Sequence, residues 1–332
     1  MRDHDVSSHR REDTMKKMIV ALAASIMTIA LAPAGEAQER LKVGGIIYAR
    51  DSQYWQQVER GMNDAAKKLG VDLQIGLNRR QLATEGQLIE DFATRGVNII
   101  VMPPLDTQAS AAAAQRAKSR NIMIVDYDTR LVDESISSHT VGVDSRQLAG
   151  EVGKQMRKLI DAKSGAATTV GLITLPPTNP NMQARRSGVV SALEGGNVTY
   201  VAEVAAATPE QGANAFENIL QRNPATEMIW VSNSGALSGA AAAARRSNAK
   251  AKLYGIDMSQ ELAQMLLDPS STLQAVSDQQ PYLIGYTAVE TAAKSFRGEK
   301  LPRHINVPAR LYTRDDPKAV NEYLDFVKSL SN

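Results

Sequence analysis

Polar side chains with complementary hydrogen-bonding chemistry follow several short apolar runs of this chain. The set contains two carboxylates, one guanidinium and two amides: Asp128, Asp257, Arg185, Asn233 and Gln279. Carboxylates accept hydrogen bonds, guanidinium groups donate them and amides do both, so the set matches the hydroxyl groups of a sugar or polyol. Each Asp or Asn taken singly is more often a helix cap. The acids and amides share a placement after predicted strands, and this favours one common ligand site.

An aromatic pair, Tyr54 and Trp55, follows the first β-forming run of the chain, with Ser52 beside it. In an open parallel sheet, residues just after a strand lie over the crevice where ligands bind. The two rings would there cover the C–H surface of a sugar ring. The alternative is a hydrophobic staple that closes the first turn of a helix ending at Leu69. The residues alone leave both interpretations open.

The sequence contains no pattern typical of catalysis or cofactor binding. The four histidines are scattered, and the zinc-peptidase, serine-hydrolase, phosphate-loop and dinucleotide-binding motifs are all missing. Without cysteine there is neither a disulfide nor a thiolate metal site. Asp128 and Asp257 could form a carboxylate pair for glycoside cleavage, but they serve equally well as hydrogen-bond acceptors. We therefore expect a binding protein rather than an enzyme, with no cofactor, no metal and, at a net charge of +2, no nucleic-acid partner.

The elements that must position these residues alternate between short apolar runs and helical patterns. Further strands after the first are predicted at 71–75, 98–102, 123–127, 140–143, 168–174, 200–204, 227–231, 253–256 and 273–277. Helices are predicted at 54–69, 82–95, 109–119, 144–158, 181–193, 209–222, 237–246, 259–267 and 282–296, with an extended segment at 305–311. This alternation is typical of parallel sheets covered on both faces. The fold class predicted is α/β, with two similar doubly wound parallel-sheet lobes around a cleft, and Trp230 is expected in a core.

The front of the chain has the organisation of an export leader. Residues 1–14 are charged, Met15-Lys16-Lys17 starts a new segment, and an apolar run of 14 residues extends from Met18 to Leu31. Small residues up to Ala37 follow, which is the order of a cleaved signal peptide, and the run is short for a membrane span of about 20 residues. We predict a signal at 15–37 cut after Ala37, or else Ala34, with an uncleaved anchor as the alternative. The mature chain would have 295 residues (332 minus 37) and a periplasmic location.

From Leu41 to about Leu311 the chain resembles the periplasmic sugar-binding proteins of the ribose type, which have the type I periplasmic binding protein fold. The resemblance rests on an ordered series of residues: Tyr54-Trp55, Gly61, Arg95-Gly96, Asp128, Arg185 with Gly188, Asn233, Gly255-Ile256-Asp257 and Gln279. It implies that Tyr54 and Trp55 stack on the ligand, helped by Ser52 and Asp128. It also implies that Arg185, Asn233, Asp257 and Gln279 close from the second lobe and hinge.

The resemblance further implies a hinge of three segments, near 143–144, near 279–280 and after His304. The predicted domains are therefore 41–143 plus 280–306 for the N-terminal lobe and 144–279 plus 307–332 for the C-terminal lobe. Such proteins deliver a captured solute to the membrane permease of an ABC importer. We expect a monomer that carries a small sugar or polyol to such a permease.

Three departures from the ribose-type pattern change the expected ligand. Thr129 stands where that family has an arginine, with Arg130 one place later, Ser234 replaces an aspartate, and Ala207 falls where an aromatic residue is expected. A roomier pocket follows, so ribose itself is not predicted.

The chain also resembles the periplasmic proteins that partner a sensor kinase for trimethylamine N-oxide. That likeness rests on Asp51-Ser52 with Tyr54-Trp55, 70–73, 81–84 and 277–279. The alternative function is therefore docking on a sensor kinase or chemoreceptor instead of an importer.

Overall fold

The computed structural model describes residues 40–163, 165–175 and 180–330. The chain divides into two units, Met1–Arg40 and Leu41–Asn332. The predicted export signal lies outside the described residues. Within them, no helix is long and apolar enough to cross a membrane.

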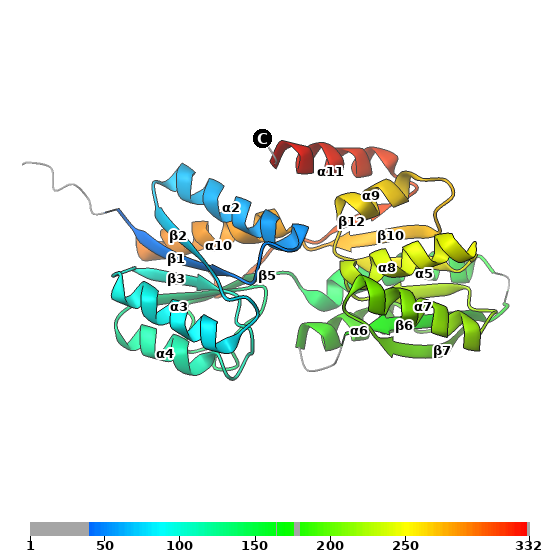
Figure 1. The fold of residues 1–332 in the computed structure, drawn as a ribbon, viewed down its shortest axis with the longest axis horizontal. Helices are drawn as coiled ribbons and strands as arrows, with labels where there is room; N and C mark the ends of the chain where they lie inside the picture. Colours follow the sequence, from blue (N-terminus) through cyan, green and yellow to red (C-terminus); the bar gives the residue numbers. More distant parts are fainter. Residues whose placement is uncertain (1–39, 164, 176–179, 331–332) are drawn as a thin grey trace, which may run out of the picture. The chain divides into compact units, whose positions relative to one another are not determined.

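The first sheet has six parallel strands in the order β11-β5-β4-β3-β1-β2 (Figure 1). Its strands are β1 (Lys42–Ile47), β2 (Asp72–Leu77), β3 (Ile99–Met102), β4 (Met123–Tyr127), β5 (His139–Gly142) and β11 (His304–Asn306). Because β1, β3 and β4 are apolar and almost fully buried, this sheet is covered on both faces.

The second sheet repeats this order as β12-β10-β9-β8-β6-β7, and only β12 runs antiparallel to its neighbour. Its strands are β6 (Thr168–Thr174), β7 (Val198–Ala205), β8 (Met228–Val231), β9 (Lys252–Ile256), β10 (Leu273–Asp278) and β12 (Arg310–Thr313). Strand for strand, β1 corresponds to β6 and β4 to β9. We call the part around the first sheet the first lobe and the part around the second sheet the second lobe.

Helices cover both faces of each sheet. The first lobe has α2 (Gln53–Leu69) and α10 (Pro281–Phe296) on one face, and α3 (Leu82–Thr94) and α4 (Ala111–Ser119) on the other. The second lobe has α5 (Ser145–Asp161) and α6 (Pro180–Leu193) on one face. Its other face is covered by α7 (Pro209–Arg222), α8 (Ser234–Ser247), α9 (Gln260–Leu267) and α11 (Pro317–Leu330).

Close backbone contacts join a pair of helices in each lobe. Between α2 and α10, a β-carbon on Gly61 would overlap the carbonyl of Tyr282, and one on Gly285 the carbonyl of Val58. Between α5 and α6, a β-carbon on Gly188 would overlap the carbonyl of Arg146. Glycine is therefore needed for the close backbone approach that fixes α2 and α6, the helices that follow β1 and β6.

The predicted fold class is confirmed: the chain forms two α/β lobes of predominantly parallel sheet. The predicted segment 305–311 proves to be two separate strands, because β11 pairs with the first sheet and β12 with the second. Helix α11 was not predicted. The residue bounds of the two lobes, 41–143 plus 280–306 and 144–279 plus 307–332, stay a prediction.

Candidate functional site

Two aspartates take the same unusual backbone conformation at equivalent strand ends. Asp128 follows β4 and Asp257 follows β9, with φ of +62° and +69°. The backbone N–H of Asp128 donates to the carbonyl of Val141 at 2.9 Å, and that of Asp257 to the carbonyl of Ser277 at 2.8 Å. Positive φ is uncommon for residues other than glycine, and aspartate is one of the few that tolerate it. Each sheet thus ends in a carboxylate held by the next strand.

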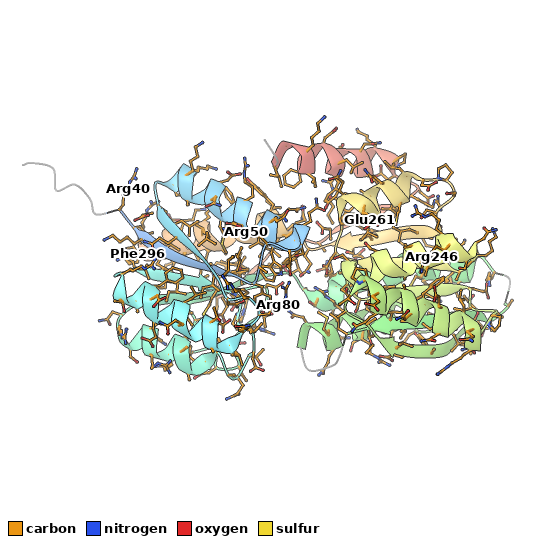
Figure 2. The ribbon with its side chains drawn as sticks, in the orientation of Figure 1. Arg40, Arg50, Arg80, Arg246, Glu261 and Phe296 are labelled. Carbon is orange, nitrogen blue, oxygen red and sulfur yellow. The ribbon has the colours of Figure 1, made fainter. Side chains whose placement is uncertain are left out.

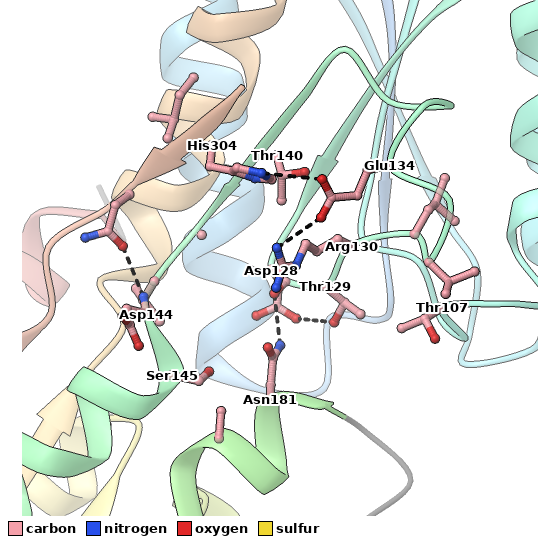
Figure 3. Close-up of a pocket in the computed structure, with 17 residues that line it drawn as sticks. Thr107, Asp128, Thr129, Arg130, Glu134, Thr140, Asp144, Ser145, Asn181 and His304 are labelled. Carbon is pink, nitrogen blue, oxygen red and sulfur yellow. Dashed lines mark hydrogen bonds and ion pairs between the residues drawn. The ribbon is translucent and has the colours of Figure 1, made fainter. Parts of the chain in front are cut away.

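The Asp128 carboxylate is bonded by hydroxyl groups. The Tyr54 hydroxyl donates to Oδ1 at 2.6 Å and the Thr129 hydroxyl to Oδ2 at 3.3 Å. Asn181 Nδ2 of α6 reaches across from the second lobe and donates to the backbone carbonyl of Asp128 at 3.0 Å (Figure 3). Burial raises the pKa of the Asp128 carboxyl, Tyr54 and Arg185 lower that pKa, and Asp257 raises it. The second lobe therefore acts electrostatically on this first-lobe carboxylate.

The Asp257 carboxylate is bonded by a cation and an amide. Arg185 Nη1 lies 3.4 Å from Oδ2, and Gln279 Nε2 donates to Oδ1 at 2.6 Å. Arg185 Nη1 also donates to the carbonyl of Ser232 at 3.0 Å. The Arg185 side chain is only 4% exposed, and in the described structure its Nε has no hydrogen-bond partner. A buried guanidinium with an unused N–H can donate to a bound hydroxyl group.

The two carboxylate groups are near enough for Asp257 to raise the pKa of Asp128. Arg185 lies four residues after Asn181 on α6, so both side chains are on the same face of that helix, and Asn181 bonds the first lobe. Burial raises the pKa of Tyr54 well above 10, with further effects from Asp128, Asp257 and Arg185. Tyr54, Asp128, Arg185 and Asp257 therefore belong to one site, and Gln279 joins it through Asp257.

Trp55 takes a different position from its neighbour Tyr54. Its side chain is 7% exposed and belongs to the core cluster of the first lobe. Its ring centroid lies 4.3 Å from that of Tyr48 and 6.4 Å from that of Tyr127. This placement favours packing of Trp55 within the first lobe, which is closer to the staple interpretation than to stacking on a ligand, and its contact with the ligand stays a prediction. Trp230 is fully buried, as expected.

Asn233 is used as a helix cap in this structure. Its Oδ1 accepts from the backbone N–H of Ala236 at 2.9 Å, and its Nδ2 donates to the carbonyl of Ala206 at 3.1 Å. Both polar groups are thus engaged at the start of α8, and its ligand role stays a prediction. Ser52 precedes α2 without a side-chain cap bond, so its hydroxyl is not committed to the helix.

Cations around the first turn of α2 are already paired. Arg50 bonds Glu59 at 2.6 Å, and Arg80 bonds Asp51 at 2.7 Å; both arginines are labelled in Figure 2. Their side chains are about half exposed, 56% and 46%. Such surface pairs stabilise little. Because both arginines pair with other carboxylates, neither of them forms an ion pair with Asp128.

A cavity of about 590 Å³ opens beside Asp128 and Asn181, between the two lobes (Figure 3). Hydroxyl, amide and charged side chains line it, including Thr107, Thr129, Arg130, Thr140, Ser145, His304 and Asn306. Neither Arg185 nor Asp257 lines this cavity. The sequence did not single out Asn181 as a site residue, although it stands one helical turn before Arg185, a spacing that could have identified it.

The described residues contain no group of three or more His, Asp or Glu side chains that could hold a metal ion. The site consists instead of fixed donors and acceptors on both lobes. Its chemistry is that of reversible hydrogen bonding to a small polar molecule.

Comparison with known proteins relates most of the chain to one family. Residues 43–300 match the family described as periplasmic binding protein domain. The ribose import binding protein RbsB of Haemophilus influenzae is 25% identical over 299 residues, covering 90% of this chain and 99% of its own. A putative rhizopine-binding protein of Rhizobium meliloti is 26% identical, covering 90% of this chain and 97% of its own. Among solved structures, a periplasmic solute binding protein of Actinobacillus succinogenes with bound D-allose is similar in fold, with a TM-score of 0.77 at 23% identity, covering 84% of this chain and all of that chain.

Proposed function

The chain belongs to the periplasmic binding protein domain family, and from this premise we propose that it captures a small sugar or polyol between its two lobes and delivers it to an ABC importer. One observation carries the proposal: each lobe contributes a carboxylate at a strand end, and fixed donors from both lobes surround the pair. Hydroxyl groups of a polyol both donate and accept, so they can bond to Asp128, Arg185, Asp257 and Gln279 together.

The named relatives support the importer as the destination. Import and solute binding are what their names state, and nothing comparable supports a sensor kinase, which stays the alternative partner. The permease contact, a monomeric state and export after processing at Ala37 are parts of the same proposal. Mass spectrometry of a periplasmic extract would test the export step, with a mature chain beginning Gln38-Glu39-Arg40 expected.

A thermal-shift and calorimetric panel of pentoses, hexoses and polyols would test the function. The protein would first be unfolded and refolded to remove any ligand that copurifies. We expect at least one compound to bind with a Kd of about 1 μM or tighter, roughly −8 kcal/mol, because closure uses a preformed donor set. The melting temperature of the protein would rise with the concentration of that compound. A panel without any response, combined with a response to trimethylamine N-oxide, would instead support the sensor alternative.

A further inference from the structure

The proposed site contains more carboxylate groups than cationic groups. Two carboxylates, Asp128 and Asp257, share a single guanidinium, that of Arg185. A third carboxylate, Asp278, lies at the end of β10 and is 3% exposed. Repulsion from Asp257 raises its pKa. The charge balance of the site therefore depends on how each carboxylate is compensated.

Asp128 forms no ion pair among the described residues, although Arg185 is near enough to lower its pKa. Its bonds come from the hydroxyl groups of Tyr54 and Thr129. The next arginine in the chain, Arg130, is directed to Glu134 at 3.3 Å and is 59% exposed (Figure 3). His304 also lies beside Glu134, at 3.5 Å. Arg130 is thus engaged by Glu134, and the hydrogen bonds to the Asp128 carboxylate come from neutral donors.

The groups bonded to Asp257 and Asp278 do not offset this excess of carboxylates either. Arg185 is committed to Asp257 and to the carbonyl of Ser232. Asp278 accepts only backbone N–H groups, from Met258 at 3.1 Å and from Gln280 at 3.0 Å. Burial, followed by repulsion from Asp257, raises the pKa of Asp278 to about 7. The site therefore holds two carboxylates, Asp128 and Asp257, for one guanidinium, that of Arg185, and one carboxylate is left without a cation.

Closing the lobes on a ligand would remove water from the carboxylate that is left without a cation. A buried charge without a partner is costly, whereas an ammonium group beside a carboxylate forms a strong charge-assisted bond. We propose that the ligand is a cation, a sugar or polyol that carries a primary amine, with its ammonium group on Asp128 and its hydroxyl groups on Arg185, Asp257 and Gln279. This inference rests on the proposed function and narrows it to one substrate class.

Matched sugars test the charge directly. Calorimetry at pH 7 on the mature chain would compare D-glucosamine, D-galactosamine and D-mannosamine with the parent hexoses and with the N-acetyl forms, which keep a nitrogen but lose its charge. We expect at least one amine to bind ten-fold or more tighter than both of its neutral counterparts. At pH 9, where the sugar amine is uncharged, that advantage should shrink to less than three-fold.

A variant pair assigns the effect to Asp128. Asp128→Asn should lower the ratio of amine to hexose affinity by ten-fold or more, whereas Asp133→Asn should leave the ratio unchanged. Asp133 is an exposed carboxylate on the same loop, so both variants change the net charge equally. If Asp128→Asn fails to fold, the pH 9 measurement on the unaltered chain decides.

The outcomes separate this inference from the function on which it rests. A parent hexose bound as tightly as its amine overturns the cationic ligand and leaves sugar capture intact. If none of the nine compounds binds, and the wider panel of neutral sugars and polyols also fails, both proposals fall.

Discussion

The aspartates that follow β4 and β9 share a backbone conformation but differ in the partners of their carboxylates. Both strands lead into an aspartate with positive φ whose N–H is held by the neighbouring strand. The donors come from equivalent helices, because α2 follows β1 and α6 follows β6 in sheets of the same strand order. In the first lobe that helix supplies the Tyr54 hydroxyl, and in the second lobe the Arg185 guanidinium.

This difference separates the tasks of the two lobes. The second lobe has its carboxylate neutralised before any ligand arrives, so it offers a fixed set of donors and acceptors. The first lobe has a partly buried carboxylate whose side-chain partners among the described residues are hydroxyl groups, so it is the side that responds most to the charge of a ligand. A repeated backbone position therefore fixes where the side chains lie, while the partner from the adjacent helix decides what they bind.

The largest expected effect concerns the first lobe's aromatic residues. Trp55→Ala should lower the free energy of unfolding by about 3–5 kcal/mol, because the ring is buried against Tyr48 and Tyr127. Urea denaturation followed by circular dichroism would measure it. Tyr200→Ala is a suitable control, because that ring is 44% exposed and should contribute much less. If Trp55→Ala instead abolishes sugar binding with unchanged stability, Trp55 stacks on the ligand, and our assignment of Trp55 to the core is wrong.

The second expected effect concerns the charged pair of the second lobe. Arg185→Gln should weaken sugar binding by about 2–4 kcal/mol, because it removes a buried cation and leaves Asp257 with Gln279 as its partner. Isothermal titration calorimetry would give the affinity. Arg246→Gln is the matched control, since it breaks an exposed pair with Glu217 on the surface (Figure 2) and should change affinity by less than about 0.5 kcal/mol. Equal losses in both variants would mean that Arg185 has no special role in the site.

The sequence predicted the strand ends well because local patterns determine them. Strands β4 and β6 and helix α7 have the predicted bounds, and Asp128 and Asp257 follow their strands as expected. Which sheet a strand joins is a non-local matter, so one extended segment was predicted where β11 and β12 pair with different sheets. The period of hydrophobic residues likewise did not reveal α11, which packs on α9 at the end of the chain.

The site was predictable in its residue types but not in its pairings. Tyr54 and Trp55 are neighbours on a helix, about 100° apart, and their sequence does not tell which of them faces the sheet. Asn233 could equally well be a cap or a ligand residue, and its neighbours Ala206 and Ala236 decide for the cap in this structure. The pairing of Arg185 with Asp257 joins residues far apart in the chain, which no local spacing can indicate.

The smallest expected effect tests the hydroxyl partner of Asp128. Burial raises the pKa of Asp128 above its ordinary value, and the Tyr54 bond partly offsets this. The stability linked to this carboxyl is therefore fully present below pH 3.8 and is lost as the pH rises through the raised pKa. Tyr54→Phe removes the donor and raises that pKa further. The variant should therefore match the natural chain at acid pH and be less stable by about 1–2 kcal/mol at pH 8.

Urea denaturation of both proteins at pH 4.5 and pH 8 would show whether their difference grows with pH. Tyr282→Phe provides the matched control, because its hydroxyl bonds the partly exposed Asp64 at 3.1 Å and should contribute about 0.5 kcal/mol or less at either pH. A difference for Tyr54→Phe that is the same at both pH values would mean that the Asp128 charge does not depend on this hydroxyl. In that case the Tyr54 hydroxyl would not affect the Asp128 pKa. The difference between a hydroxyl partner in the first lobe and a guanidinium partner in the second would then make no difference to stability.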